Sequence, residues 1–352
     1  STKRSPLGMY ESVGIVFLIA IAFASILWAQ DKALALFRSV SLAEAIVLFA
    51  AIRMFRPRLQ LIAWSIVAGA AVQSAVAFVQ YFQQTVAAHT WLGTAFHSAE
   101  TLGDSVVENS DTRVLRSYGT FPHPNVLALY LGFAWICCFS LAGYVRSRFQ
   151  QWSALISLSL ISAGLLFTFS RSAWLSLLAA LAIAGIASAV RHRRFHFPDF
   201  KKGVPPRTVS ALVALITICI ISFAIWEPLS VRLGIQGWQR LERASVAERT
   251  SLTADALSQA SSVWLRGVGI GQYTNTSALR EGATSKDHQA YDFQPVHLLY
   301  LLIYIELGLF GAVGFIGIFV RELFRSRKTR TALQFLIFLG ISALFDHAYW
   351  TS

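Results

Sequence analysis

Apolar residues occur along this chain in nine long runs that are separated by shorter polar segments. The runs lie near residues 12–29, 33–52, 60–83, 122–145, 152–169, 171–190, 208–226, 297–320 and 332–350. A hydrocarbon layer about 30 Å thick needs roughly 20 apolar residues per helix, at about 1.5 Å of rise each. The pattern therefore predicts an all-α polytopic transmembrane helical bundle of about nine spans, forming a single integral membrane domain over residues 1–352.

The runs 152–169 and 171–190 follow one another almost without a break. A single helix from Trp152 to Val190 would be about 58 Å long, which is far longer than the membrane is thick. The polar Ser170-Arg171-Ser172 is the only plausible corner between the two runs. We therefore expect a tight hairpin that carries Arg171 at its tip.

The composition fits a membrane protein and excludes an ordinary soluble one. Of the 352 residues, 55% are hydrophobic and only 14% are charged, and the mean hydropathy is +0.55. No small-residue cleavage pattern follows the first apolar run, so we interpret that run as a span and not as a signal peptide. All three cysteines, Cys137, Cys138 and Cys219, lie in apolar runs, which excludes disulfides between loops and CxxC-type metal sites.

The positions of Lys and Arg predict the orientation of the spans. The net charge is +12, and more than half of the 30 basic residues lie in the N-terminal segment and four short connections, of which 191–207 holds most. Basic residues accumulate on the cytoplasmic side, so we expect these segments to be cytoplasmic and the charge to reflect lipid and not nucleic acid. The loops 84–121 and 227–296 and the 170–172 corner are then extracytoplasmic.

The segment from Arg116 to Asn125, just ahead of the fourth run, is the first candidate for chemistry. Its two prolines and one glycine predict a rigid turn, beside which Arg116 could present a planar fork of donors to a phosphate. The simpler alternative is a helix-entry turn whose arginine contacts lipid headgroups.

Two further arginines are candidates for binding an anion. Arg171 is expected at headgroup depth between helices, where a charge is costly without a partner, although it could simply anchor the corner. Arg249 heads an apolar stripe with three- and four-residue spacing, which predicts an amphipathic helix. On the buried face of that helix it requires an anion; on the exposed face it would pair with Glu248 or Asp255.

Two local patterns surround this predicted helix. Ser245-Val246-Ala247-Glu248 matches a capping box and predicts that the helix starts there. The later Gly267-Val268-Gly269-Ile270-Gly271 is not a dinucleotide site, because no strand–helix–strand unit surrounds it. It predicts a flexible turn that permits close approach of two backbones.

His297 stands where the chain re-enters the membrane after Gln294-Pro295-Val296. Tyr300 and Tyr304 follow it at i+3 and i+7, so one polar aromatic face continues down the span. Imidazole is the side chain best suited to accept a proton near neutral pH. A lone interfacial histidine is nevertheless often structural.

Two further ionisable positions lie near the last spans. Glu306 is half a helical turn away from His297 and roughly 13 Å further along the helix, where a carboxylate must be partnered or protonated. Asp346-His347 is expected on the outer side, either as a buried pair near the site or as a boundary cap.

These motifs together resemble those of the O-antigen ligase and polymerase superfamily. The segment from Arg116 to Asn125 resembles its R-x-x-G-T-F-x-x-P-N motif, and 170–172 resembles its S-R-S corner. Glu248-Arg249 with the glycine run resembles its large loop, and His297 with Glu306-Leu307-Gly308 resembles its H-N…E-L-G span. The ordered set covers about 116–311, with one departure: Leu298 stands where the family often shows Asn.

The resemblance implies a GT-C-like, metal-independent glycosyltransferase that uses no cofactor and faces the periplasm from the inner membrane. Its donor would be a glycan on undecaprenyl pyrophosphate, and its acceptor lipid A–core, a second lipid-linked glycan or a protein. In this interpretation His297 is the base, Arg116, Arg171 and Arg249 clamp the pyrophosphate, and Tyr300 and Glu306 bind substrate.

The main rival hypothesis is a transporter or flippase for a lipid-linked or anionic substrate, in which Glu306 and Arg171 would line a pathway. Such a protein should show inverted repeats, and none is evident in the sequence. A non-catalytic scaffold is the third alternative.

Overall fold

The computed structural model describes residues 9–55, 57–108, 112–145, 147–192, 205–235, 240–280, 294–327 and 329–351. The chain divides into two compact units. The first contains Ser1–Pro57, Ala247–Arg325 and Ala343–Ser352, and the second contains Arg58–Val246 and Ser326–Ser342. Each unit has its own packing. The prediction of a single integral membrane domain stays a prediction.

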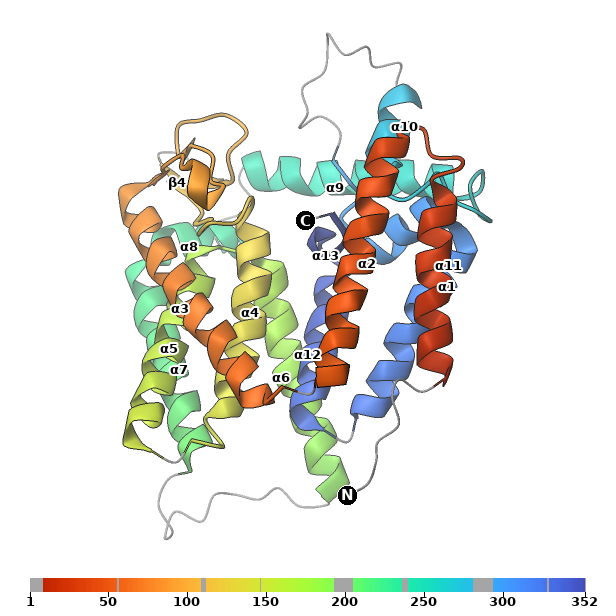
Figure 1. Cartoon of the computed structure of the whole chain (residues 1–352). Helices are drawn as coiled ribbons and strands as arrows, with labels where there is room; N and C mark the ends of the chain where they lie inside the picture. The colour runs from red at the N-terminus through yellow and green to blue at the C-terminus, as the bar shows by residue number, and fades with distance from the viewer. Residues whose placement is uncertain are drawn as a thin grey trace. The chain divides into compact units, whose positions relative to one another are not determined.

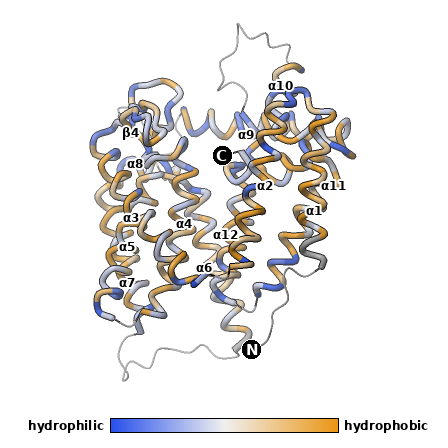
Figure 2. The backbone as a smooth tube through the Cα atoms, in the orientation of Figure 1, coloured by the Kyte–Doolittle hydropathy of each residue, from blue (hydrophilic) through white to orange (hydrophobic). Residues whose placement is uncertain are grey.

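Every predicted apolar run contains a helix, which confirms the all-α membrane fold. Within the described ranges, seven helices are long and apolar enough to cross a membrane: α2 (Lys32–Phe55), α3 (Leu59–Gln83), α4 (Pro124–Leu141), α5 (Arg148–Phe167), α6 (Arg171–His192), α7 (Pro206–Ala224) and α11 (Leu299–Ser326). Two further apolar helices are shorter, Val13–Ser25 within α1 (Met9–Ser25) and α12 (Arg330–Ser342). Figure 2 shows the hydrophobic residues along the helices.

The second unit packs α3, α5, α6, α7 and α12 around α4 (Figure 1). The hydrophobic window of α4 is 72% buried, against 11% in that of α7. Helix α7 instead exposes Leu212, Leu215 and Ile216. Such large exposed apolar side chains fit a lipid environment, where apolar surface has no need to avoid the solvent.

The chain reverses between α5 and α6 as the sequence predicts. Helix α5 ends at Phe167 and α6 begins at Arg171. Phe169 lies between them with a φ of 48°, and its side chain is fully buried. The left-handed backbone at this residue turns the chain within three residues, so the predicted hairpin is confirmed. Its turn lies at residues 168–170 and not at 170–172, because Arg171 and Ser172 already belong to the first turn of α6.

The connection from α3 to α4 contains two small sheets that the apolar pattern does not predict. Strand β1 (Thr85–Val86) pairs with β2 (His97–Ser98), and β3 (Val106–Glu108) pairs with β4 (Arg113–Leu115), both antiparallel. A short 3-10 helix, Thr90–Leu92, lies in the first hairpin. Strands of two or three residues are too short to show a clear alternation of apolar and polar side chains.

The first unit contains α1, α2, α10 (Tyr273–Arg280), α11, α13 (Ala348–Thr351) and the greater part of α9 (Arg240–Ala260). In Figure 1, α9 runs crosswise to α11. Ala256 of α9 packs with Tyr273, Val296 and Leu302 in one core cluster. The predicted stripe is confirmed, because Arg249, Leu252, Thr253, Ala256 and Ala260 are all buried or half-buried.

Two predicted boundaries are wrong. Helix α9 begins at Arg240 and not at Ser245, so the S-x-x-E pattern lies inside the helix, where its serine caps nothing. The last run, 332–350, is not one helix, because α12 ends at Ser342 and the chain turns before α13. Asp346 accepts a hydrogen bond from the backbone N–H of Ala348 at 2.9 Å, which starts the new helix.

Candidate functional site

The segment from Arg116 to Asn125 is held against α3 by two glutamine side chains. Gln80 accepts hydrogen bonds at Oε1 from the backbone N–H groups of Tyr118 and Gly119 and donates one to the Gly119 carbonyl. Gln73 accepts a hydrogen bond from the backbone N–H of Thr120 and donates one to the Thr120 hydroxyl. The predicted rigid turn is therefore confirmed, although its rigidity depends on side chains of α3 as well as on proline and glycine.

The side chain of Arg116 is engaged inside the second unit. It is 6% exposed, and its Nε donates to the Thr168 carbonyl at 2.7 Å. One terminal nitrogen donates to Asn125 Oδ1 at 2.6 Å. Arg116 thus joins both ends of its own motif to the corner between α5 and α6. That it contacts a phosphate stays a prediction.

The corner also carries a cluster of two arginines and one carboxylate, here called the Arg171 cluster: Arg171, Arg232 and Glu242. An Arg171 terminal nitrogen lies 2.7 Å from Glu242 Oε2, and Arg232 binds the other carboxylate oxygen. Arg232 Nε also donates to the Phe169 carbonyl at 2.9 Å. Glu242 is 5% exposed, whereas the Arg171 side chain is 31% exposed. Two guanidinium groups thus share this carboxylate beside the N-terminus of α6, where the helix dipole favours anions.

In the first unit, a loop of the glycine run is joined to α11 by backbone hydrogen bonds. Val268 donates to the Ile305 carbonyl and Gly269 to the Glu306 carbonyl, both at 2.9 Å, and Leu309 donates to the Trp264 carbonyl at 2.8 Å. The helix is interrupted at Gly308, whose φ is 67°. A Cβ at Gly308 would lie 2.2 Å from the Leu265 carbonyl oxygen, so only glycine allows this contact. The predicted close backbone approach is confirmed.

Next to this junction is a second group, here called the His297 cluster: Arg249, His297, Asp346 and His347. The imidazole rings of His297 and His347 have centroids 5.2 Å apart. His347 Nδ1 is 2.6 Å from Thr351 Oγ1, whereas the buried Nδ1 of His297 has no hydrogen-bond partner among the described residues. The sequence left open whether Asp346 caps a helix or lies near His297. The structure shows both, since Asp346 caps α13 and its charge acts on His297.

The surroundings keep His297 neutral at physiological pH. Burial, followed by the positive charges of Arg249 and His347, lowers the pKa of His297 from 6.5 to about 4, against a smaller opposite effect of Asp346. Burial also lowers the pKa of His347. A neutral imidazole can accept a proton, and a nearby anion would raise its basicity.

Glu306 and Tyr300 face different neighbours from His297. Glu306 is 2% exposed, and its Oε2 accepts a hydrogen bond from Trp350 Nε1 at 2.6 Å. It lines a pocket of about 90 Å³ together with Arg38 and Trp350. Tyr300 packs edge-on against Phe315. The expectation that Glu306 must be partnered is confirmed, whereas substrate binding by either residue stays a prediction.

Sequence reasoning did not identify several of these residues. Arg232 and Glu242 lie in no recognised motif, and Gln73 and Gln80 read as ordinary polar positions within an apolar run. The Arg171 cluster becomes visible only in the structure, because Arg171 is separated in sequence from Arg232 by 61 residues and from Glu242 by 71 residues. The segments 193–204 and 281–293, with Lys201 and Lys286, lie outside the described residues.

Comparison with known protein families finds a match in the central part of the chain. Residues 156–316 match a family model described as O-antigen ligase, whereas no curated protein matches the chain. The match runs from α5 through α11 and so contains Arg171, Arg249, His297 and Glu306. Arg116 and the segment around it lie ahead of the matched region. The central part of this multi-pass membrane protein, residues 156–316, is therefore similar to the O-antigen ligase family.

Proposed function

We propose that this protein moves a glycan from undecaprenyl pyrophosphate to an acceptor on the periplasmic face of the inner membrane, without a metal ion. The acceptor is lipid A–core, a second lipid-linked glycan or a protein. The match of residues 156–316 to the O-antigen ligase family supports a membrane glycosyltransferase of the ligase or polymerase type that acts on lipid-linked glycans. The donor, the face and the chemistry are the proposal.

The reaction needs one proton acceptor and neutralisation of the leaving group. As the acceptor oxygen bonds to the anomeric carbon, the bond from that carbon to the pyrophosphate oxygen breaks. The electron pair leaves with undecaprenyl pyrophosphate, and His297 takes the hydroxyl proton. Arginine stabilises the developing charge on the pyrophosphate, so no metal is required for that role.

The unpartnered Nδ1 of His297 is the observation that carries the assignment of the base. A buried polar nitrogen without a hydrogen bond is costly, and such groups in native proteins need an explanation. An acceptor hydroxyl would supply the missing partner. Arg249, whose charge acts on His297, would bring the donor pyrophosphate close to the same nitrogen.

The arginines of the second unit have two different roles in this proposal. Arg171 is partly exposed at the N-terminus of α6, which supports contact with the pyrophosphate. Arg116 is almost fully buried and donates two hydrogen bonds within its unit, which supports a positioning role. Tyr300 and Glu306 are proposed to shape the substrate site near α11.

The test is transfer by the purified protein between a lipid-linked donor and an acceptor. His297→Ala should lower the turnover by about 10²–10⁴-fold because the base is lost. His347→Ala, which removes the histidine already bonded to Thr351, should lower it less, and the exposed His89→Ala should not change it. Wild-type turnover of His297→Ala, or loss of wild-type activity on adding a chelator, would refute the mechanism.

The proposed face can be tested separately in spheroplasts. Lys286→Cys should react with an impermeant thiol reagent from outside, whereas Lys201→Cys should react only after the membrane is opened. Labelling of position 201 alone in intact spheroplasts would reverse the topology. Movement of the donor across vesicles without any transfer would instead favour the rival hypothesis of a flippase.

A further inference from the structure

The second unit has a pocket at the end of α4 that lies away from Asn125 and the proposed chemistry, and apolar as well as polar and charged side chains line it. Its volume is about 270 Å³, and it lies between the last turns of α4 and the first turns of α7 and α12. The side chains that determine its character are Ser140, Arg207, Thr208, Arg330, Thr331 and Gln334. The charge pattern of the sequence predicts that this end of the helices is cytoplasmic.

Three features of the pocket favour an anion. Arg207 and Arg330 are both exposed, and neither forms an ion pair with a carboxylate among the residues that the structure describes. Both stand in the first turn of their helices, α7 of 19 residues and α12 of 13 residues. Two helix N-termini therefore point their partial positive charge toward the same space.

The side chain of Gln334 is a separate observation, independent of the two arginines, that favours a ligand in this pocket. Its side chain is 2% exposed and lines the pocket, yet its buried Nε2 has no hydrogen-bond partner in the part of the chain that the structure describes. An amide NH₂ in that position can only donate, so its absent partner must be an acceptor. The neighbouring hydroxyl groups of Ser140 and Thr331 are already bonded to each other at 3.0 Å.

Arg207 is also held in place before any ligand arrives. Its guanidinium lies 5.9 Å from the ring centroid of Tyr144. A Cβ at Gly143 would come within 2.5 Å of Arg207 Nε, so the glycine leaves the space that the side chain occupies. A cation with a restricted conformation loses less entropy on binding.

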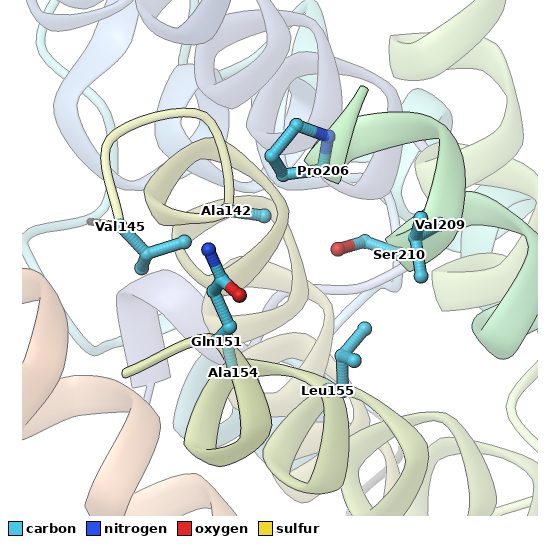
Figure 3. Close-up of a pocket in the computed structure, with 8 residues that line it drawn as sticks. All are labelled: Ala142, Val145, Gln151, Ala154, Leu155, Pro206, Val209 and Ser210. Atoms are coloured by element: carbon cyan, nitrogen blue, oxygen red, sulfur yellow. The ribbon is translucent and has the colours of Figure 1, made fainter. Parts of the chain in front are cut away.

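The other side of the same helical turn provides a contrast within the molecule. Pro206, Val209 and Ser210 line a second pocket of about 190 Å³ between α4, α5 and α7 (Figure 3). Apart from the Gln151 amide and the Ser210 hydroxyl, its side chains are apolar, and none of them is charged. Of these two pockets, only the one lined by Arg207 and Arg330 is therefore cationic.

We propose that the pocket formed by Arg207, Arg330 and Gln334 binds a phosphate group, either that of an anionic phospholipid headgroup or a free phosphate. The two arginines supply charge-assisted hydrogen bonds, and Gln334 Nε2 donates to a phosphate oxygen. A membrane leaflet supplies such headgroups at high local concentration. This site is separate from the proposed transfer reaction and does not depend on it.

The test is native mass spectrometry of the full chain with added phosphatidylglycerol, with phosphatidylcholine as the zwitterionic comparison. The wild type should retain phosphatidylglycerol preferentially. Arg207→Gln combined with Arg330→Gln should weaken retention by about tenfold or more. The matched control is Arg148→Gln, since Arg148 is an exposed arginine in the first turn of α5 that does not line the pocket; it should retain the lipid unchanged.

Gln334→Leu keeps the test valid should the double variant fail to fold. It removes a buried donor that has no partner, so it should leave the unliganded protein at least as stable while weakening retention several-fold. A second arm measures thermal stabilisation by inorganic phosphate. Stabilisation that depends on Arg207 and Arg330, without retention of lipid, identifies free phosphate as the source. Equal behaviour of the wild type and the double variant toward both ligands, or an equal loss in Arg148→Gln, would overturn the proposal.

Discussion

The two units hold their functional charges in opposite ways. In the second unit, Arg171 and Arg232 share Glu242, and Arg116 is bonded to a carbonyl and to Asn125. In the first unit, His297 has a buried nitrogen that nothing in the described structure bonds. The arginines of the second unit therefore have hydrogen-bond partners before any substrate binds. The imidazole of His297 still has one nitrogen that could bond to a substrate.

The difference follows from what each group has to do. A permanent cation that is buried must be paired, because an isolated buried charge is far more costly than a neutral ring nitrogen without a partner. A base must be neutral and must have a free lone pair, so a permanent partner would remove its function. The comparison predicts that mutations in the second unit act mainly through stability and those around His297 mainly through turnover or pH.

The largest effect is expected from Glu242→Gln. It leaves Arg171 and Arg232 without their shared carboxylate, which for a buried pair should cost about 3–5 kcal/mol of stability. Thermal or denaturant unfolding in detergent measures this cost. Glu248→Gln changes an exposed carboxylate of the same helix α9 and should stay within about 0.5 kcal/mol of wild type. Equal stability of the two variants would show that the Arg171 cluster is not an anchor.

Gly308→Ala should be next, because it forces a side chain into the junction between α11 and the 264–269 loop. The positive φ and the 2.2 Å approach to the Leu265 carbonyl together predict a loss of about 2–5 kcal/mol. Gly317→Ala is the control in the same helix, since nothing lies within 4 Å of an added Cβ there. Gly317→Ala should be neutral or stabilising. Unfolding curves that rank the two variants in the opposite order would contradict the observed junction.

An acid-dependent loss of stability is expected from His297 and should be smaller, on the order of 2–3 kcal/mol. The folded pKa of about 4 lies below the ordinary value of 6.5, so the unfolded chain binds the proton more readily. The stabilising contribution is therefore complete above pH 6.5 and is lost as the pH falls toward 4. His297→Gln should flatten this part of the stability profile, leaving a remainder from His347. Superimposable profiles of wild type and variant would rule out the proposed environment.

Arg249→Lys should have the smallest effect in this series, a decrease in transfer of about ten- to a hundredfold. The charge is kept, but the planar fork that binds two phosphate oxygens is lost. Steady-state transfer at saturating acceptor measures the change, and expression should hold. Arg243→Lys alters an exposed arginine of α9 and serves as the control. Wild-type turnover of Arg249→Lys would return Arg249 to a structural role.

Much of the fold was predictable because a membrane imposes a simple requirement on sequence. Each of the nine apolar runs contains a helix, and the corner before Arg171 is where chain length demanded it. The failures are at boundaries. The capping pattern at Ser245 lies inside α9, and the run 332–350 breaks at Ser342, because short motifs and hydropathy do not register the tertiary contacts that end a helix.

The candidate site was predictable only in part. His297, Arg171 and Arg249 stand out as ionisable side chains at membrane boundaries, and this can be read from position alone. Glu242 could not be found in that way, because its partners Arg171 and Arg232 are separated from it by 71 and 10 residues. The closeness of His347 to His297 depends likewise on the turn after α12 and not on any spacing in the chain.

The amino-acid sequence by itself determined the membrane environment, the number of apolar helices and the types of side chain available for chemistry. These follow from local hydrophobicity and charge, because each residue contributes separately to the free energy of inserting a segment into the bilayer. Only the tertiary structure decided which ionisable groups are paired and which are left open. Pairing depends on distances between residues far apart in the chain, and these distances are set by packing, as in the junction of Gly308 with Leu265.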